Sequence, residues 1–172
     1  VKESSYKPGT ELTLSYSLAI PNASLVAISI QHYMKDVGVT VKLQQLEFGT
    51  YMTYAMKRDK RMGHMDLFTW PGTIDPIWRM VLGFRSTGFY TPYNNRPNKK
   101  LMDQLVDQQA VMIDLPPRLK VLKKIHELDY KDPATVPLLG LKMIYAMNKD
   151  IDYTYLTLRH YMDHLYTVKK LK

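Results

Sequence analysis

The sequence predicts an α/β fold in which a mixed, largely parallel sheet is flanked by helices. Two observations lead to this class. Apolar side chains recur at every second residue in some segments and at every third or fourth residue in others, as strands and amphipathic helices require. In the first half of the chain these segments alternate as strand, helix, strand, helix, strand, which is typical of parallel strands joined by right-handed crossovers. The length of 172 residues fits one domain or one lobe.

The first strand and the first helix are predicted at residues 11–19 and 25–37. In the strand, leucine and tyrosine alternate with mostly polar residues. In the helix, apolar residues recur at intervals of three and four and leave a polar face for water. Asn22 or Ser24 can cap the start of this helix, and Gly38 can end it in a left-handed conformation.

The next helix lies between two further predicted strands. Residues 39–48 form the second strand, and residues 49–62 form a helix with Thr50 as its expected cap. Gly63 stops this helix. The third strand covers residues 64–70, and its continuous apolar character predicts a central place in the sheet.

The second half of the chain is predicted to be more helical. Residues 74–98 carry Pro, Gly and Asn and indicate a short helix mixed with loop. Helices are expected from 99 to 113 and from 114 to 128. Asn98, before the first, and Asp114, at the start of the second, are the expected caps. Residues 134–148 are expected to form one or two strands near a sheet edge. The tail from residue 153 onward is aromatic and basic, and its pattern favours no element.

Composition excludes several classes of protein. The chain has no cysteine, so disulfides, thiolate catalysis and thiolate zinc sites are excluded. No apolar run is long enough to span a bilayer. The first ten residues lack the apolar segment of a signal peptide, so we expect any export signal to lie outside this chain.

The formal net charge of +8 leaves a nucleic-acid-associated domain as an alternative function. The basic residues are nevertheless scattered in short clusters at 57–61, 99–100, 123–124 and 169–172. Scattered clusters favour solvated helix faces over a nucleic-acid footprint, and we expect no nucleic-acid partner. Steeply salt-dependent DNA binding would distinguish the alternative.

The sequence offers little support for catalysis. It contains neither a glycine-rich phosphate loop nor the G-x-S-x-G motif of hydrolases. His160 and His164 have helical spacing, but no third metal ligand is evident. Glu47, Asp66 and Asp75 lie near strand ends without pairing as acid and base. We therefore expect no catalytic residue, metal or cofactor, and a small α/β enzyme remains an alternative.

The stretch MDLFTWPGTIDP, residues 65–76, is the strongest candidate for a binding site. Ligands of parallel α/β sheets bind outside the carboxyl ends of the strands. Trp70, Pro71, Gly72 and Thr73 lie at such an end of the third predicted strand. Trp70 therefore either forms an aromatic wall for a ligand or fills the edge of the core.

Three segments together resemble one family of transport proteins. They are ISIQHYMKDVGVTVKLQQLEF, EFGTYMTYAMKRDKRMGHMDLFTWPGTIDP and the run from PYNNRPNKKL to ATVPLL. In order and spacing they resemble the C-terminal lobe of bacterial periplasmic solute-binding proteins of family 5, which serve dipeptide, oligopeptide and nickel ABC transporters. The resemblance covers nearly the whole chain.

The resemblance implies that residues 1–172 form one lobe of a two-lobed binding protein whose other lobe is absent from this chain. It further implies a periplasmic protein that captures a peptide or other small solute and delivers it to membrane permease subunits. The implied ligand-binding residues are Trp70, Pro71, Gly72, Thr73 and Asp75.

One departure from the family pattern concerns the peptide chemistry. The family pattern W-x-x-D-Y-x-D-P becomes WPGTIDP here, which is one residue shorter. The first Asp, which resembles the group that pairs with the α-amino end of a peptide, is replaced by Thr73. Either the ligand is not a free-amine peptide, or Asp75 has taken over this role. Because an Asp before Pro can also cap the next helix, we favour the first possibility.

Overall fold

The computed structural model describes residues 6–57, 59–70, 75–88, 96–133, 135–140, 146, 148–152 and 169–170. The chain forms two compact units, Val1–Trp70 and Pro71–Lys172. The assignment of all 172 residues to a single lobe stays a prediction.

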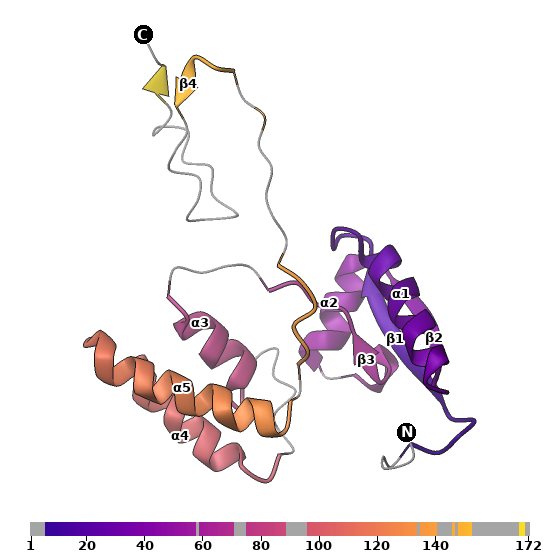
Figure 1. Cartoon of the computed structure of the whole chain (residues 1–172), viewed down its shortest axis with the longest axis horizontal. Coiled ribbons are helices and arrows are strands. Elements are labelled where there is room, and N and C mark those ends of the chain that lie inside the picture. Colours follow the sequence, from indigo (N-terminus) through magenta and orange to yellow (C-terminus); the bar gives the residue numbers. More distant parts are fainter. Residues whose placement is uncertain are drawn as a thin grey trace. The chain divides into compact units, whose positions relative to one another are not determined.

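The first unit contains a three-stranded parallel sheet in the order β2-β1-β3 (Figure 1). Strand β1 pairs with β2 over its whole length, from Glu11 opposite Thr40 to Ser17 opposite Leu46. Its other edge pairs with the two residues of β3. The strands are β1 (Glu11–Ser17), β2 (Thr40–Leu46) and β3 (Met65–Asp66). The expected α/β class with largely parallel strands is therefore confirmed. The central place expected for the third strand is wrong, because β1 lies between the other two.

Helices α1 (Ala23–Asp36) and α2 (Phe48–Lys57) connect these strands, and a short 3-10 turn, η1 (Lys60–Met62), follows α2. The end of α1 is as expected, because Gly38 has a positive φ of 81°. The expected cap is at the observed position for α1 but not for α2. Asn22 precedes α1 without a capping side-chain hydrogen bond. Thr50 lies inside α2, and the carboxylate of Glu47 accepts the N–H groups of Gly49 and Thr50 instead.

The core of the first unit lies between the sheet and α1. It combines alternate side chains of β1 with the inner face of α1 and with the residues that begin β2 and follow β3. Its fully buried apolar members are Leu14, Tyr16, Ala23, Ala27, Val39, Val41 and Leu67. Leu67 therefore ties the exit of β3 to the core, one residue after the strand ends.

The second unit packs helices against one another (Figure 1). They are α3 (Ile77–Arg79), the π-helical turn η2 (Met80–Phe84), α4 (Lys99–Ala110) and α5 (Leu115–Lys131). Their shared core contains Met80, Phe84, Met102, Leu105, Val106, Val121 and Ile125. Two prolines lie in the first turn of α5, where their missing N–H groups need no helical partner.

Several details of the second unit differ from the expectations. The apolar residues Leu101 and Leu119 are exposed, since the helices meet along neighbouring stripes of residues. Asn98 and Asp114 precede their helices but make no capping side-chain hydrogen bond. Residues 135–140 form no regular element, although strands were expected there. A short antiparallel pair lies further along the chain, formed by β4 (Ile151–Asp152) and β5 (Lys169–Lys170).

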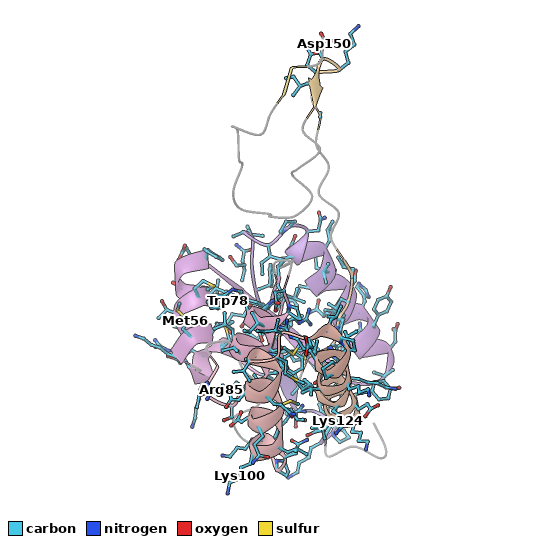
Figure 2. The ribbon with its side chains drawn as sticks, turned by 90° about the vertical axis from the view of Figure 1, so that its left-hand side faces the viewer. Met56, Trp78, Arg85, Lys100, Lys124 and Asp150 are labelled. Carbon is cyan, nitrogen blue, oxygen red and sulfur yellow. The ribbon has the colours of Figure 1, made fainter. Side chains whose placement is uncertain are left out.

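The exposed lysines of the second unit lie on different helices. Lys100 on α4 and Lys124 on α5 both extend from the ribbon toward solvent (Figure 2). Among the residues that the structure describes, no helix has both the length and the apolar character needed to cross a bilayer.

Candidate ligand-binding site at the exit of strand β3

Two of the five residues expected to bind a ligand lie in the described part of the chain. Trp70 ends the first unit, and Asp75 belongs to the second unit. Pro71, Gly72 and Thr73 lie outside the described residues, so their part in a binding site stays a prediction.

Trp70 is partly buried and pairs with a second aromatic residue. The ring centroids of Phe68 and Trp70 lie 5.7 Å apart with an interplanar angle of 54°, within the range of favourable aromatic contacts. Phe68 is 39% exposed, whereas Leu67 before it is buried in the core. The exit of β3 thus buries one side chain and leaves two aromatic rings partly accessible to a ligand.

Phe68 was not among the residues expected from the sequence to bind a ligand. The sequence signal that could have identified Phe68 is the two-residue period of an extended segment, in which residues 68 and 70 lie on the same side. An aromatic residue two positions before Trp70 could therefore have been expected to contact it.

Tyr51 of α2 contacts this strand exit through its hydroxyl group. Its side chain is fully buried. Its hydroxyl oxygen lies 2.8 Å from Oδ2 of Asp66 and 2.7 Å from the carbonyl oxygen of Leu67. Burial raises the pKa of Tyr51, and the neighbouring carboxylate raises it further, so this hydroxyl keeps its proton.

Asp66 ends β3 beside this hydroxyl. Burial of the carboxyl group raises the pKa of Asp66, while the hydrogen bond from Tyr51 opposes the rise. Asp66 as a whole residue is nevertheless exposed.

The start of β3 is held to β1 by both the backbone and a side chain. The backbone N–H of His64 donates to the carbonyl of Thr13 over 3.0 Å. The N–H of Thr13 donates to Nδ1 of His64, also over 3.0 Å. After the strand, the N–H of Leu67 donates to the carbonyl of Ser15 over 2.9 Å. A two-residue strand is therefore extended at both ends by hydrogen bonds to β1.

Asp75 takes part in a polar cluster within the second unit. Nη1 and Nη2 of Arg118 donate to its two carboxylate oxygens over 2.8 and 2.6 Å. The N–H of Ile77 donates to Oδ1 over 2.8 Å, at the start of α3. Arg118 also donates to Oε1 of the buried Gln109. The hydrogen bonds from Arg118 hold the pKa of Asp75 below its ordinary value.

Asp75 thus lies beside the start of α3, where it accepts the N–H of Ile77, and its part in ligand binding stays a prediction. Arg118 is 13% exposed in its side chain and provides a bidentate partner. The sequence analysis missed Arg118, because it lies 43 residues from Asp75 and no local pattern links the two.

The other acidic candidates have structural partners of their own. Glu47 caps α2, and Asp66 accepts a hydrogen bond from Tyr51. Within the described part of the chain, no group of three or more His, Cys, Asp or Glu residues is arranged to hold a metal ion. His160 and His164 lie outside that part.

Solved structures with a similar fold belong to ABC-transporter binding proteins. AppA from Clostridium difficile, assigned as a peptide-binding protein, has a TM-score of 0.59 and 17% identity. NikA from Staphylococcus aureus, in complex with Ni(L-His)2, has a TM-score of 0.57 and 18% identity. CtaP from Listeria monocytogenes, an ABC transporter substrate-binding protein, has a TM-score of 0.53 and 24% identity.

These matches cover 71–72% of this chain and 25% of each of the three structures. The chain therefore spans about a quarter of the length of the proteins it resembles. No protein-family profile matches the sequence. A comparison with curated proteins finds no match. Matches at 17–24% identity show a shared fold. The resemblance expected from the sequence is therefore confirmed for the fold.

Proposed function

We propose that this chain is part of the substrate-binding component of an ABC transporter. The protein captures a peptide or other small solute in a cleft between two lobes and presents it to permease subunits in the membrane. The observation that carries the proposal is the shared fold with AppA, NikA and CtaP over more than two thirds of the chain. These three are binding proteins, which favours a binding role over an enzymatic one. A periplasmic location follows from the same proposal.

Trp70 forms an aromatic wall of the cleft in this proposal, and Phe68 supports it. The partial exposure of the two rings and their contact support this assignment, because a side chain that only filled the core would be enclosed. Pro71, Gly72 and Thr73 complete the proposed set of ligand-binding residues next to Trp70 in the sequence.

The solute is not held by a carboxylate at its α-amino end. Thr73 has no charge, and a buried ammonium group without a counter-charge is strongly disfavoured. The carboxylate of Asp75 already accepts three hydrogen bonds, two from Arg118 and one from Ile77. A peptide with a blocked amine, or a solute other than a peptide, therefore suits these residues better than a free-amine peptide.

Titration calorimetry on the full-length protein tests the proposal. The ligands are a mixture of free short peptides, the same mixture N-acetylated, and Ni(L-His)2. At least one of them is expected to bind with a micromolar dissociation constant. Failure of all three to bind, together with steeply salt-dependent binding of DNA, would replace the proposal by a nucleic-acid-associated function.

A further inference from the structure

We propose that Tyr51 is a positioning residue for the exit of β3, and that a proton shared between Tyr51 and Asp66 sets the orientation of Trp70. The inference deepens the proposed function, because it rests on Trp70 as part of the ligand site. It gives this side of the cleft a pH-dependent shape.

The hydroxyl of Tyr51 has two oxygen neighbours and one hydrogen. Asp66 Oδ2 lies 2.8 Å away and the carbonyl oxygen of Leu67 lies 2.7 Å away. Both distances are those of O–H···O hydrogen bonds, yet one hydroxyl donates fully to one acceptor at a time. With Asp66 ionised, one of these short contacts therefore lacks a well-aligned hydrogen.

Protonation of Asp66 supplies the missing hydrogen. The carboxyl O–H of Asp66 then donates to the Tyr51 oxygen, and the Tyr51 O–H donates to the carbonyl of Leu67. No covalent bond between heavy atoms changes, and the added proton comes from solvent, to which Asp66 is exposed. The two short contacts are then satisfied together, and the hydroxyl of Tyr51 is free to donate fully to the carbonyl of Leu67.

The connection from Tyr51 to Trp70 is short. Leu67 is fixed on two sides, by Tyr51 through its carbonyl and by Ser15 of β1 through its N–H. Trp70 follows three residues later and its ring contacts Phe68. A loosened hydrogen bond at Leu67 therefore changes the direction in which the two aromatic rings leave the sheet.

The other ionisable groups near this strand exit are engaged elsewhere. Arg61 of η1 pairs with Asp59 over 2.6 Å and lies over the ring of Tyr54, 4.5 Å from its centroid. His64 accepts the N–H of Thr13. Glu47 caps the start of α2. Tyr51 is thus the ionisable partner of Asp66 among the described residues, and burial of the carboxyl shifts its titration toward higher pH than usual.

Tryptophan fluorescence of the 172-residue chain tests the inference without any ligand. The chain has two tryptophans, and Trp78 is exposed, so Trp78→Phe leaves Trp70 as the only tryptophan, which is excited selectively at a wavelength that tyrosine does not absorb. In the Trp78→Phe variant, the fluorescence emission of Trp70 is expected to change between neutral and acidic pH as the titration of a single group. The midpoint is expected above about 3.9, the ordinary pKa of an Asp side chain.

Two variants and one control complete the test. Asp66→Asn provides an amide N–H that donates to Tyr51 at every pH, so its emission should stay at the acid value. Tyr51→Phe removes the shared hydroxyl and should abolish the titration. Tyr33→Phe, which changes a tyrosine of α1 that is 72% exposed, should leave the titration unchanged.

An unchanged titration in Tyr51→Phe, or its absence from the parent chain, would overturn the inference. If circular dichroism shows that Tyr51→Phe fails to fold, Asp66→Asn still decides, because pH-dependent emission from that variant contradicts the shared proton. These outcomes are independent of ligand binding. Failure of the inference therefore differs from failure of the proposed function, which the calorimetry reports.

Discussion

Trp70 is the residue whose role is most open to direct measurement. Its partial burial implies that Trp70→Ala removes less core packing than truncation of a fully buried aromatic residue, which costs about 3–5 kcal/mol. In the full-length protein we expect a loss of stability below about 3 kcal/mol and a larger proportional loss of affinity. Urea unfolding and calorimetry measure the two quantities. The exposed Trp78, changed to Ala, is the control and should leave affinity unchanged. A loss of stability without a loss of affinity would show that Trp70 belongs to the core and not to the ligand site.

The second prediction at the residue scale concerns the α-amino group of a bound peptide. Because Thr73 is uncharged and Asp75 is engaged by Arg118, acetylation of a bound peptide's amine should change affinity less than about tenfold, or 1.4 kcal/mol. Calorimetry with one peptide, free and N-acetylated, measures this in the full-length protein. If acetylation and Asp75→Asn both abolish binding, Asp75 is the anchor and the favoured interpretation is wrong.

The pair of Arg118 and Asp75 should make stability depend on pH. The pKa of Asp75 is lowered in the folded chain, so its stabilising contribution is present above the unfolded value of about 3.9 and is lost as pH falls through the folded value. Since Asp75 is half exposed, we expect Arg118→Met to cost about 1 kcal/mol at neutral pH, and less below about pH 4. Urea unfolding at several pH values measures it.

A lysine of the same helix provides the control for Arg118→Met. Lys123 and Glu127 form a long, exposed ion pair of 3.9 Å. Lys123→Met should leave stability unchanged at each pH. A cost of Arg118→Met that persists undiminished in acid would show that the side chain stabilises the fold by packing and by its hydrogen bonds to Gln109, and not by its ion pair with Asp75.

At the scale of elements, the two-residue strand β3 depends on the turn before it. Gly63 has a positive φ of 88°, and a Cβ there would lie 2.8 Å from Cβ of Thr13. Gly63→Ala should therefore cost roughly 2 kcal/mol or more, from backbone strain together with the clash. Gly38→Ala is the matched control, because Gly38 has a similar φ of 81° and open space around it. Equal losses in the two variants, measured by urea unfolding, would contradict a close approach of Gly63 to β1.

The elements themselves differ in how well local sequence predicts them. Helix α1 was expected at nearly its observed position, because a regular apolar stripe and a glycine define it. The third strand was expected at residues 64–70, but only Met65 and Asp66 pair with β1. Strand length depends on backbone pairing with a distant segment, which periodicity does not report. The residues that precede α1, α4 and α5 were expected at the observed cap positions, but their side chains make no capping hydrogen bond. Whether such a bond forms depends on the folded backbone, which the sequence pattern does not report.

At the scale of the whole molecule, the chain alone should bind solutes poorly. Closure around a ligand places contacts on two lobes, and this chain spans about a quarter of the structures it resembles. Calorimetry of the 172-residue chain against the peptide mixture should detect no binding tighter than roughly millimolar. The full-length protein, measured in parallel, is the positive control. A micromolar dissociation constant for the chain alone would contradict a divided site.

The sequence by itself determined the α/β class, the order of strands and helices in the first unit, and the strand exit at Trp70 as the candidate site. These depend on periodicity and on Gly and Pro, which act over a few neighbouring residues. Only the tertiary structure paired Asp75 with Arg118, brought Tyr51 to Asp66 and Leu67, and left Phe68 against Trp70. Hydrogen bonds and ring contacts depend on where the folded backbone places each side chain. Asp75 and Arg118, 43 positions apart, become partners only after the segment before α3 and helix α5 have come together in the folded chain.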